Sequence, residues 1–134
     1  MANYYGAARS NYFRVKDIQA FKCWAEGLDL KVIHGTDQGN TTFALLPPHW
    51  SDDGCFPSYK PDTNEHIDLA AELSLHLDTD SVAIIIEIGA EKLRYLHGHA
   101  LAINASGETV TVQLADIYNI AATKLKGEIT HPEY

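Results

Sequence analysis

The stretch from Ser81 to Leu114 constrains the fold most, because it has the pattern of three consecutive strands joined by two tight turns. Residues 82–88 are β-branched and nearly all apolar, which suits a strand that is buried on both faces. Residues 105–108, Ala-Ser-Gly-Glu, are a turn signal between the second and third strands. The sequence therefore predicts an antiparallel meander over residues 81–114.

A tight turn at residues 105–108 fixes how the second and third strands pair. It sets small residues opposite larger ones: Ala102 opposite Val110, Ala100 opposite Val112, and Gly98 opposite Leu114. Because side chains alternate along a strand, we assign these six to one apolar face together with Ala83, Ile85 and Leu96. We expect helices to pack closely on this face. The opposite face then carries Tyr95, His97, His99, Leu101, Ile103, Thr109, Thr111 and Gln113.

The length of 134 residues fits a single domain, residues 1–134, with enough chain for a genuine core. No apolar run approaches the roughly 18 residues that a membrane-spanning helix needs, so we expect no membrane segment. The first residues lack the charged and apolar regions of a signal peptide, which makes a cytoplasmic location the expectation. In that setting Cys23 and Cys55 do not suggest a disulfide framework.

The formal net charge of −8 is unevenly distributed along the chain. Residues 52–91 hold ten acids and a single base, Lys60. A protein that grips a nucleic-acid backbone needs a basic footprint, so we expect no direct contact with that backbone. An acidic surface instead favours a protein partner with a basic surface.

The first half of the chain predicts a strand, a helix and a hairpin. Residues 1–10 fit an arm or a ragged first strand, and residues 11–15 have the alternation of a strand. A helix is expected from Asp17, as its N-cap or as an acid of its first turn, to Gly27. Residues 29–34 and 41–46 form a predicted hairpin around a turn rich in Gly and Asx.

The second half begins with a long segment, residues 47–62, in which four prolines exclude a helix or a central strand. This loop is either functional or a cover whose aromatic side chains plug the core. Helices are expected over residues 64–77 and 115–124, on either side of the meander. The predicted fold class is α+β: a mainly antiparallel sheet of about six strands, in the order β-α-β-β-loop-α-β-β-β-α, with helices packed on one face.

His97-Gly98-His99 puts two imidazoles on one side of one strand. Imidazoles bind metals, but no third ligand is evident, so we assign no metal site and no cofactor. Acid–base work by His97 or His99 with Tyr95 is the best enzymatic alternative. A Cys55 nucleophile with His49 or His97 would need a geometry that sequence alone does not give, so no catalytic residue is assigned.

Two stretches resemble small uncharacterised accessory proteins of phages, plasmids and other mobile elements. They are residues 8–24, which begin Ala-Arg-Ser-Asn-Tyr-Phe-Arg-Val-Lys-Asp, and residues 87–99, Glu-Ile-Gly-Ala-Glu-Lys-Leu-Arg-Tyr-Leu-His-Gly-His. The resemblance covers about half of the chain and brings no established activity. It implies a setting in which some acidic proteins inhibit host defence nucleases, as antirestriction or anti-CRISPR proteins.

Three hypotheses follow from these patterns. The first is a protein-binding module, which docks through acidic residues and loop aromatics: Trp50, Phe56, Tyr59, Glu65, Asp68, Glu72, Asp78 and Asp80. The second is a small-molecule-binding protein or small enzyme with a pocket on the sheet, closed by the loop and lined by Tyr95, His97, His99, Thr111 and Gln113. The third is a homodimer or other self-assembly through the histidine face or an edge strand.

Overall fold

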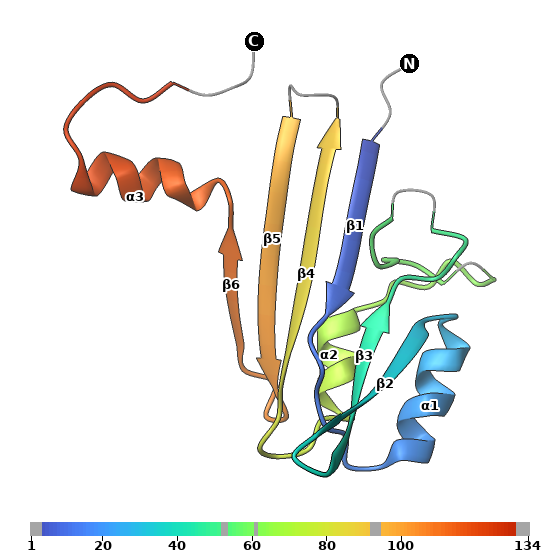
Figure 1. Ribbon diagram of the computed structural model, residues 1–134. Helices are drawn as coiled ribbons and strands as arrows, with labels where there is room; N and C mark the ends of the chain where they lie inside the picture. Colours follow the sequence, from blue (N-terminus) through green and yellow to red (C-terminus); the bar gives the residue numbers. More distant parts are fainter. Residues whose placement is uncertain (1–3, 52–53, 61, 92–94, 131–134) are drawn as a thin grey trace.

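The computed structural model describes residues 4–51, 54–60, 62–91 and 95–130 of the chain (Figure 1). The side chains of Tyr4, Tyr5 and Tyr95 are not among the described parts. The described elements are β1 (Tyr4–Ser10), α1 (Ile18–Gly27), β2 (Lys31–Asp37), β3 (Asn40–Leu46), α2 (Leu69–Ser74), β4 (Val82–Glu91), β5 (Tyr95–Asn104), β6 (Thr109–Gln113) and α3 (Asp116–Lys124).

The strands form two antiparallel sheets. One has four strands in the order β1-β4-β5-β6, and the other is the β2-β3 hairpin. The prediction of an α+β fold with six mainly antiparallel strands is therefore confirmed, with the strands divided between two sheets. The meander is also confirmed, because β4, β5 and β6 pair in sequence.

The first strand lies earlier in the chain than expected. Residues 4–10, which fitted either an arm or a ragged strand, form β1 and pair with β4 along their whole length. The predicted strand at residues 11–15 is reduced to two isolated bridges, Phe13 with Phe43 and Val15 with Leu77. The first bridge reaches β3 of the hairpin, while the N–H of nearby Asn11 donates to the carbonyl of Ile84 in β4, so this segment connects the two sheets. The second bridge joins Val15 to the segment after α2.

The helix and hairpin that follow agree with the sequence. The Asp17 side chain accepts a hydrogen bond from the backbone N–H of Ala20 and caps α1. The hairpin turns at Gln38 and Gly39, whose φ angles of 52° and 84° both lie in the left-handed region. Two consecutive residues with positive φ are typical of the type I′ turn of a two-residue hairpin, so the strands extend further toward the turn than expected.

The core forms where α1 and α2 meet the sheets. Phe21 of α1 is fully buried and lies edge-on to Phe13 and close to Phe43, with ring centroids 5.7 and 5.3 Å away. The Trp24 indole N–H donates to Glu72 at 3.0 Å, which ties α1 to α2. The His76 ring lies against Trp24, and burial together with nearby Lys16 lowers the pKa of His76.

The second helix is shorter than predicted. Residues 64–77 were expected to be helical, whereas α2 begins at Leu69, with Asp68 as the N-cap that accepts from the N–H of Ala71. Asn64 has a φ of 58°, which a helix cannot accommodate, and Tyr59 and His66 form a bridge instead. The turn chemistry of residues 62–66 thus overrides the helical spacing of the apolar residues.

The faces of the meander correct one prediction. The β5–β6 pairing is as expected, with Ala100 opposite Val112 and Ala102 opposite Val110. In β4, however, Ile85 lies opposite Leu101, so Ala83 and Ile85 share the histidine face rather than the glycine–alanine face. We call this side the inner face; its covered part is Ala83, Ile85, Leu101 and Ile103.

The prediction that helices cover Gly98, Ala100 and Ala102 is therefore wrong. Helix α2 packs on the inner face beside β5. The expected position of Glu87, opposite Arg94 and away from the histidines, is also wrong, because Glu87 pairs with His99; Arg94 lies outside the described residues. The expected partner of Glu87, Arg94, and the observed partner, His99, are five residues apart in the chain, and a shift by an odd number of residues exchanges the two faces of a strand.

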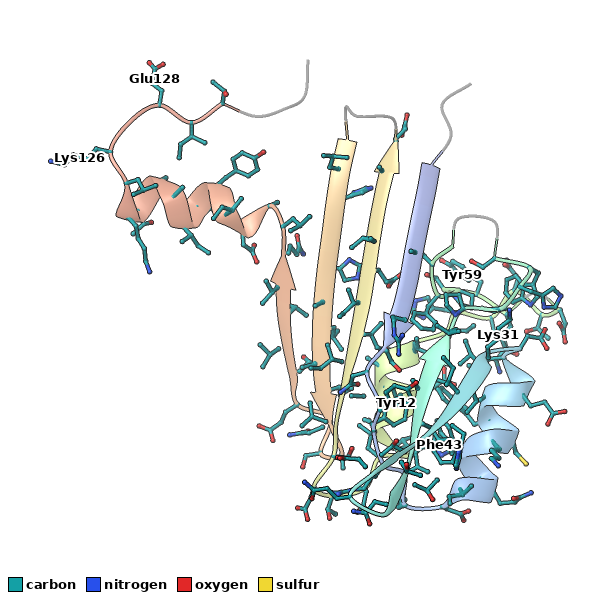
Figure 2. All side chains as sticks on the ribbon, in the orientation of Figure 1. Tyr12, Lys31, Phe43, Tyr59, Lys126 and Glu128 are labelled. Atoms are coloured by element: carbon teal, nitrogen blue, oxygen red, sulfur yellow. The ribbon has the colours of Figure 1, made fainter. Side chains whose placement is uncertain are left out.

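Helix α3 follows β6 and projects away from the rest of the molecule (Figure 1). Its bounds agree with the predicted helix at 115–124, but none of its nine residues is buried. A short linker, Leu114 and Ala115, joins it to β6, and the N–H of Gln113 donates to Asp116 at 2.8 Å across that linker. The segment after it also lies far from the core, as Lys126 and Glu128 show (Figure 2).

Candidate functional site

A polar cavity lies on the inner face of the sheet, beyond the part that α2 covers. Its volume is about 310 Å³, and its walls come from the loop and from three strands: Cys55, Glu87, His97, Gly98, His99 and Gln113. A neighbouring cavity of about 250 Å³ also borders Glu87 and His99, and it continues under the loop toward Phe56 and α2.

Strand register places the polar groups of the cavity in one row. Glu87, His99 and Gln113 lie opposite one another on β4, β5 and β6, and His97 lies two residues along β5 on the same face. The Nε2 atom of His99 is 3.4 Å from a carboxylate oxygen of Glu87. The two groups form an ion pair when the imidazole is protonated, and Glu87 is the more buried of the two.

The predicted ligand-binding residues are only partly brought together. His97, His99 and Gln113 line the cavity. Thr111 lies on the same face opposite Leu101 but is not among the lining residues, and the side chain of Tyr95 is not described. Sequence reasoning missed Glu87, because the assumed register turned it to the other face.

The cavity offers donors, acceptors and one thiol within a small volume. In the described part of the chain, no group of three or more His, Cys, Asp or Glu residues could hold a metal ion. Cys55 comes from the 47–62 loop, which was expected to close over the histidines, and it shares the cavity with His97 and His99. Such a lining can orient a small polar ligand by hydrogen bonds from both the loop and the sheet.

The three loop aromatics occupy different environments. Phe56 is buried in the core, as the cover hypothesis for the loop predicts. The Trp50 indole N–H donates to Asp29 at 3.1 Å, which fastens the loop beside α1. Tyr59 is 54% exposed, with its ring 5.6 Å from His66 (Figure 2). Of these three candidate anchors, Tyr59 is the most open to a partner.

Most of the candidate acidic residues already interact within the chain. Glu72 accepts from Trp24, and the Asp68 side chain caps α2. Glu65 lies 3.7 Å from Lys60, and Asp78 lies 4.0 Å from Arg14. Asp80 is exposed in the turn before β4. A basic partner would have to compete with these internal contacts for four of the five carboxylates.

The other side of the meander carries a surface that the sequence analysis expected to be buried. We call it the outer apolar face. Its large side chains are 45–69% exposed: Val82, Ile86, Ile88, Leu96, Val110, Val112 and Leu114. The small residues Gly98, Ala100 and Ala102 lie between them on β5. Large exposed apolar patches mark interaction sites in soluble proteins, so this face is a second candidate site.

The outer apolar face contains a shallow groove of about 210 Å³ along β5. Its walls are Ile86 and Ile88 on β4, Val112 on β6, and Leu114 directly after β6. Its floor contains Gly98, where a Cβ atom would lie 3.2 Å from both Ile88 and Leu114. The missing side chain at Gly98 therefore keeps the groove open at that point.

Comparison of the chain with protein-family models, with curated proteins and with solved structures finds no match. No helix in the described ranges is long and apolar enough to cross a membrane. The function of this protein has to be inferred from the geometry of its two candidate sites.

Proposed function

We propose that this chain is a protein-binding module whose docking surface is the outer apolar face. The observation that supports the proposal is the exposure of seven large aliphatic side chains, six on three adjacent strands and the seventh, Leu114, directly after β6. Burying one Val, Leu or Ile side chain is worth about 1.5–3 kcal/mol, so leaving all of them in water is costly for an isolated domain. A protein surface that covers the face recovers this free energy.

Two observations favour this face over the acidic residues as the docking surface. Four of the five candidate carboxylates have partners in the chain, whereas the apolar side chains of β4 and β6 face solvent. Interface cores are also depleted in charged residues and rich in apolar ones. A role as an inhibitor of a host defence system is a narrower version of this proposal, supported by the resemblance to mobile-element proteins alone.

The proposal is tested with Val110→Lys/Val112→Lys, which places two charges on the outer apolar face. Thr109→Lys/Thr111→Lys is the matched control, since it adds the same charges to the same strand on the inner face, where both side chains are exposed. We expect the wild type and the control to retain a bound protein, either another copy or a different chain, in co-purification. The outer-face variant should lose that protein because a buried lysine without a partner opposes docking.

The readout is the amount of that protein recovered per tagged chain, quantified by mass spectrometry from cells that also express an untagged copy. Equal recovery with the outer-face variant and the wild type would contradict the proposal. Equal loss with the control would also contradict it, since the effect would then follow from added charge rather than from the outer face.

A second candidate function is the binding of a small polar ligand in the inner cavity. The observation that favours it is the convergence of Glu87, His97, His99 and Gln113 with the loop residue Cys55 around about 310 Å³, a volume typical of small-ligand sites. A carboxylate, an amide and two imidazoles can satisfy a ligand that has both donors and acceptors.

This second function predicts that a bound ligand shields Cys55. We expect a screen of small polar compounds to find ones that slow the alkylation of Cys55 and shift the ring signals of His97 and His99 in NMR spectra. Glu87→Gln should weaken those effects, while alkylation of the exposed Cys23 should not change. Compounds that shift the ring signals equally in the Glu87→Gln variant would argue against a site built around this carboxylate.

A further inference from the structure

Besides the outer apolar face, α3 carries exposed apolar side chains. Ile117 and Ile120 are exposed and lie three residues apart, so they form a short apolar stripe on one side of α3, and the exposed Leu125 follows directly after the helix. An isolated helix of nine residues is only marginally stable in water, and α3 buries none of its residues within its own chain. The stripe therefore needs a surface to pack against.

The spacing of the strands that carry the groove suits a helix. Its walls stand on β4 and β6, which are separated by one intervening strand and therefore lie about 9–10 Å apart. This separation matches the diameter of about 10–12 Å of a helix with its side chains. Small residues at the floor, Gly98 and Ala100, allow close approach along the axis of the groove.

The turn after β6 directs α3 away from the groove of its own chain. The N–H of Gln113 donates to Asp116, and the N–H groups of Ile117 and Tyr118 donate to the carbonyls of Leu114 and Ala115 at 3.2 Å each. These bonds define a tight connection of two residues. For α3 to lie on its own sheet, this connection would have to open and reverse direction.

We infer that the outer apolar face is covered by α3 of a second copy of this chain, in a symmetric dimer with exchanged helices. This inference rests on the proposed function and names the partner of the same face. A two-fold axis lets each copy supply one groove and one helix, so both apolar surfaces are covered twice in a closed assembly.

The exposed apolar area is of the size that such a dimer uses. Full burial of a Val, Leu or Ile side chain removes about 60–120 Å² from water, so ten such side chains that are about half exposed hold roughly 300–600 Å² per copy. A stable interface buries about 800 Å² per partner, of which about 65% is apolar in homodimers. The formal charge of −8 per chain opposes association, and the apolar area has to outweigh that repulsion.

The test is the molar mass in solution, measured by light scattering across the micromolar range. The wild type should have twice the 14.8 kDa of one chain. Ile117→Glu/Ile120→Glu places two charges on the stripe and should raise the dissociation constant of the dimer at least about a hundredfold, because the carboxylates would be buried without partners. Asn119→Glu/Ala122→Glu adds the same charges on the opposite side of α3 and should remain dimeric.

The altered residues are exposed in the single chain, so each variant should keep the fold. Circular dichroism checks that the strands are retained. A wild type that is monomeric at every concentration would overturn the inference, as would a dimer that persists in the stripe variant. If the wild type is monomeric but a different protein is still lost with Val110→Lys/Val112→Lys, the proposed function stands and only the second copy is rejected. If that substitution also changes nothing, both proposals fail.

Discussion

Replacing Phe21 with alanine is expected to lower the free energy of unfolding by about 3–5 kcal/mol, the range for a fully buried phenylalanine. Phe21 is 0% exposed and lies between Phe13, from the segment that bridges the sheets, and Phe43 of β3. Its removal leaves a cavity at the point where the hairpin, α1 and the bridging segment meet. Chemical denaturation, followed by circular dichroism at a fixed protein concentration, measures the change.

Ile18→Ala provides the control for that substitution, because Ile18 is in the same helix and is 42% exposed. Ile18→Ala should lower the free energy of unfolding by well under half as much as Phe21→Ala, since much of the Ile18 side chain is already in water. A Phe21→Ala variant that loses less than about 1 kcal/mol would contradict the assignment of the core.

The second large effect concerns protein concentration. If the folded state is a dimer, each tenfold increase in concentration should add about 1.4 kcal/mol to the apparent stability, because unfolding also separates the two chains. The midpoint of thermal unfolding should therefore rise steadily over a dilution series of the wild type. Scanning calorimetry or circular dichroism across that series measures the shift.

The Ile117→Glu/Ile120→Glu variant should show no such dependence, because a monomer unfolds without dissociation. Asn119→Glu/Ala122→Glu should keep the dependence of the wild type. A wild-type midpoint that stays constant over a hundredfold change in concentration would show that unfolding does not involve dissociation of two chains.

Local patterns predicted most of the elements correctly, because their causes are local. The Asp17 cap, the turn at residues 105–108 and the period of the meander depend on neighbouring residues, and each appears in the structure. The β5–β6 register also followed from the turn that joins these strands. The late start of α2 was not predicted, since the spacing of the apolar residues does not reveal that Asn64 adopts a positive φ, which a helix excludes.

The faces of β4 could not be derived in the same way. Strand β4 is apolar on both sides, so its own sequence does not decide which side is buried. The cover comes from distant parts of the chain: Phe13, Phe56 and α2 bury Ile85 and its neighbours. For the same reason the cavity was predicted only in part, with the histidines and Gln113 placed correctly and Glu87 on the wrong side.

The central claim is that the outer apolar face and the stripe of α3 cover each other between two copies. It is tested most directly by NMR on a mixture of isotope-labelled and unlabelled chains, with filters that select contacts between different molecules. The claim predicts contacts between the methyl groups of Ile117 or Ile120 in one chain and those of Ala100 or Val112 in the other. Contacts of these methyl groups found only within a single chain, or none at all between α3 and the sheet, would contradict it.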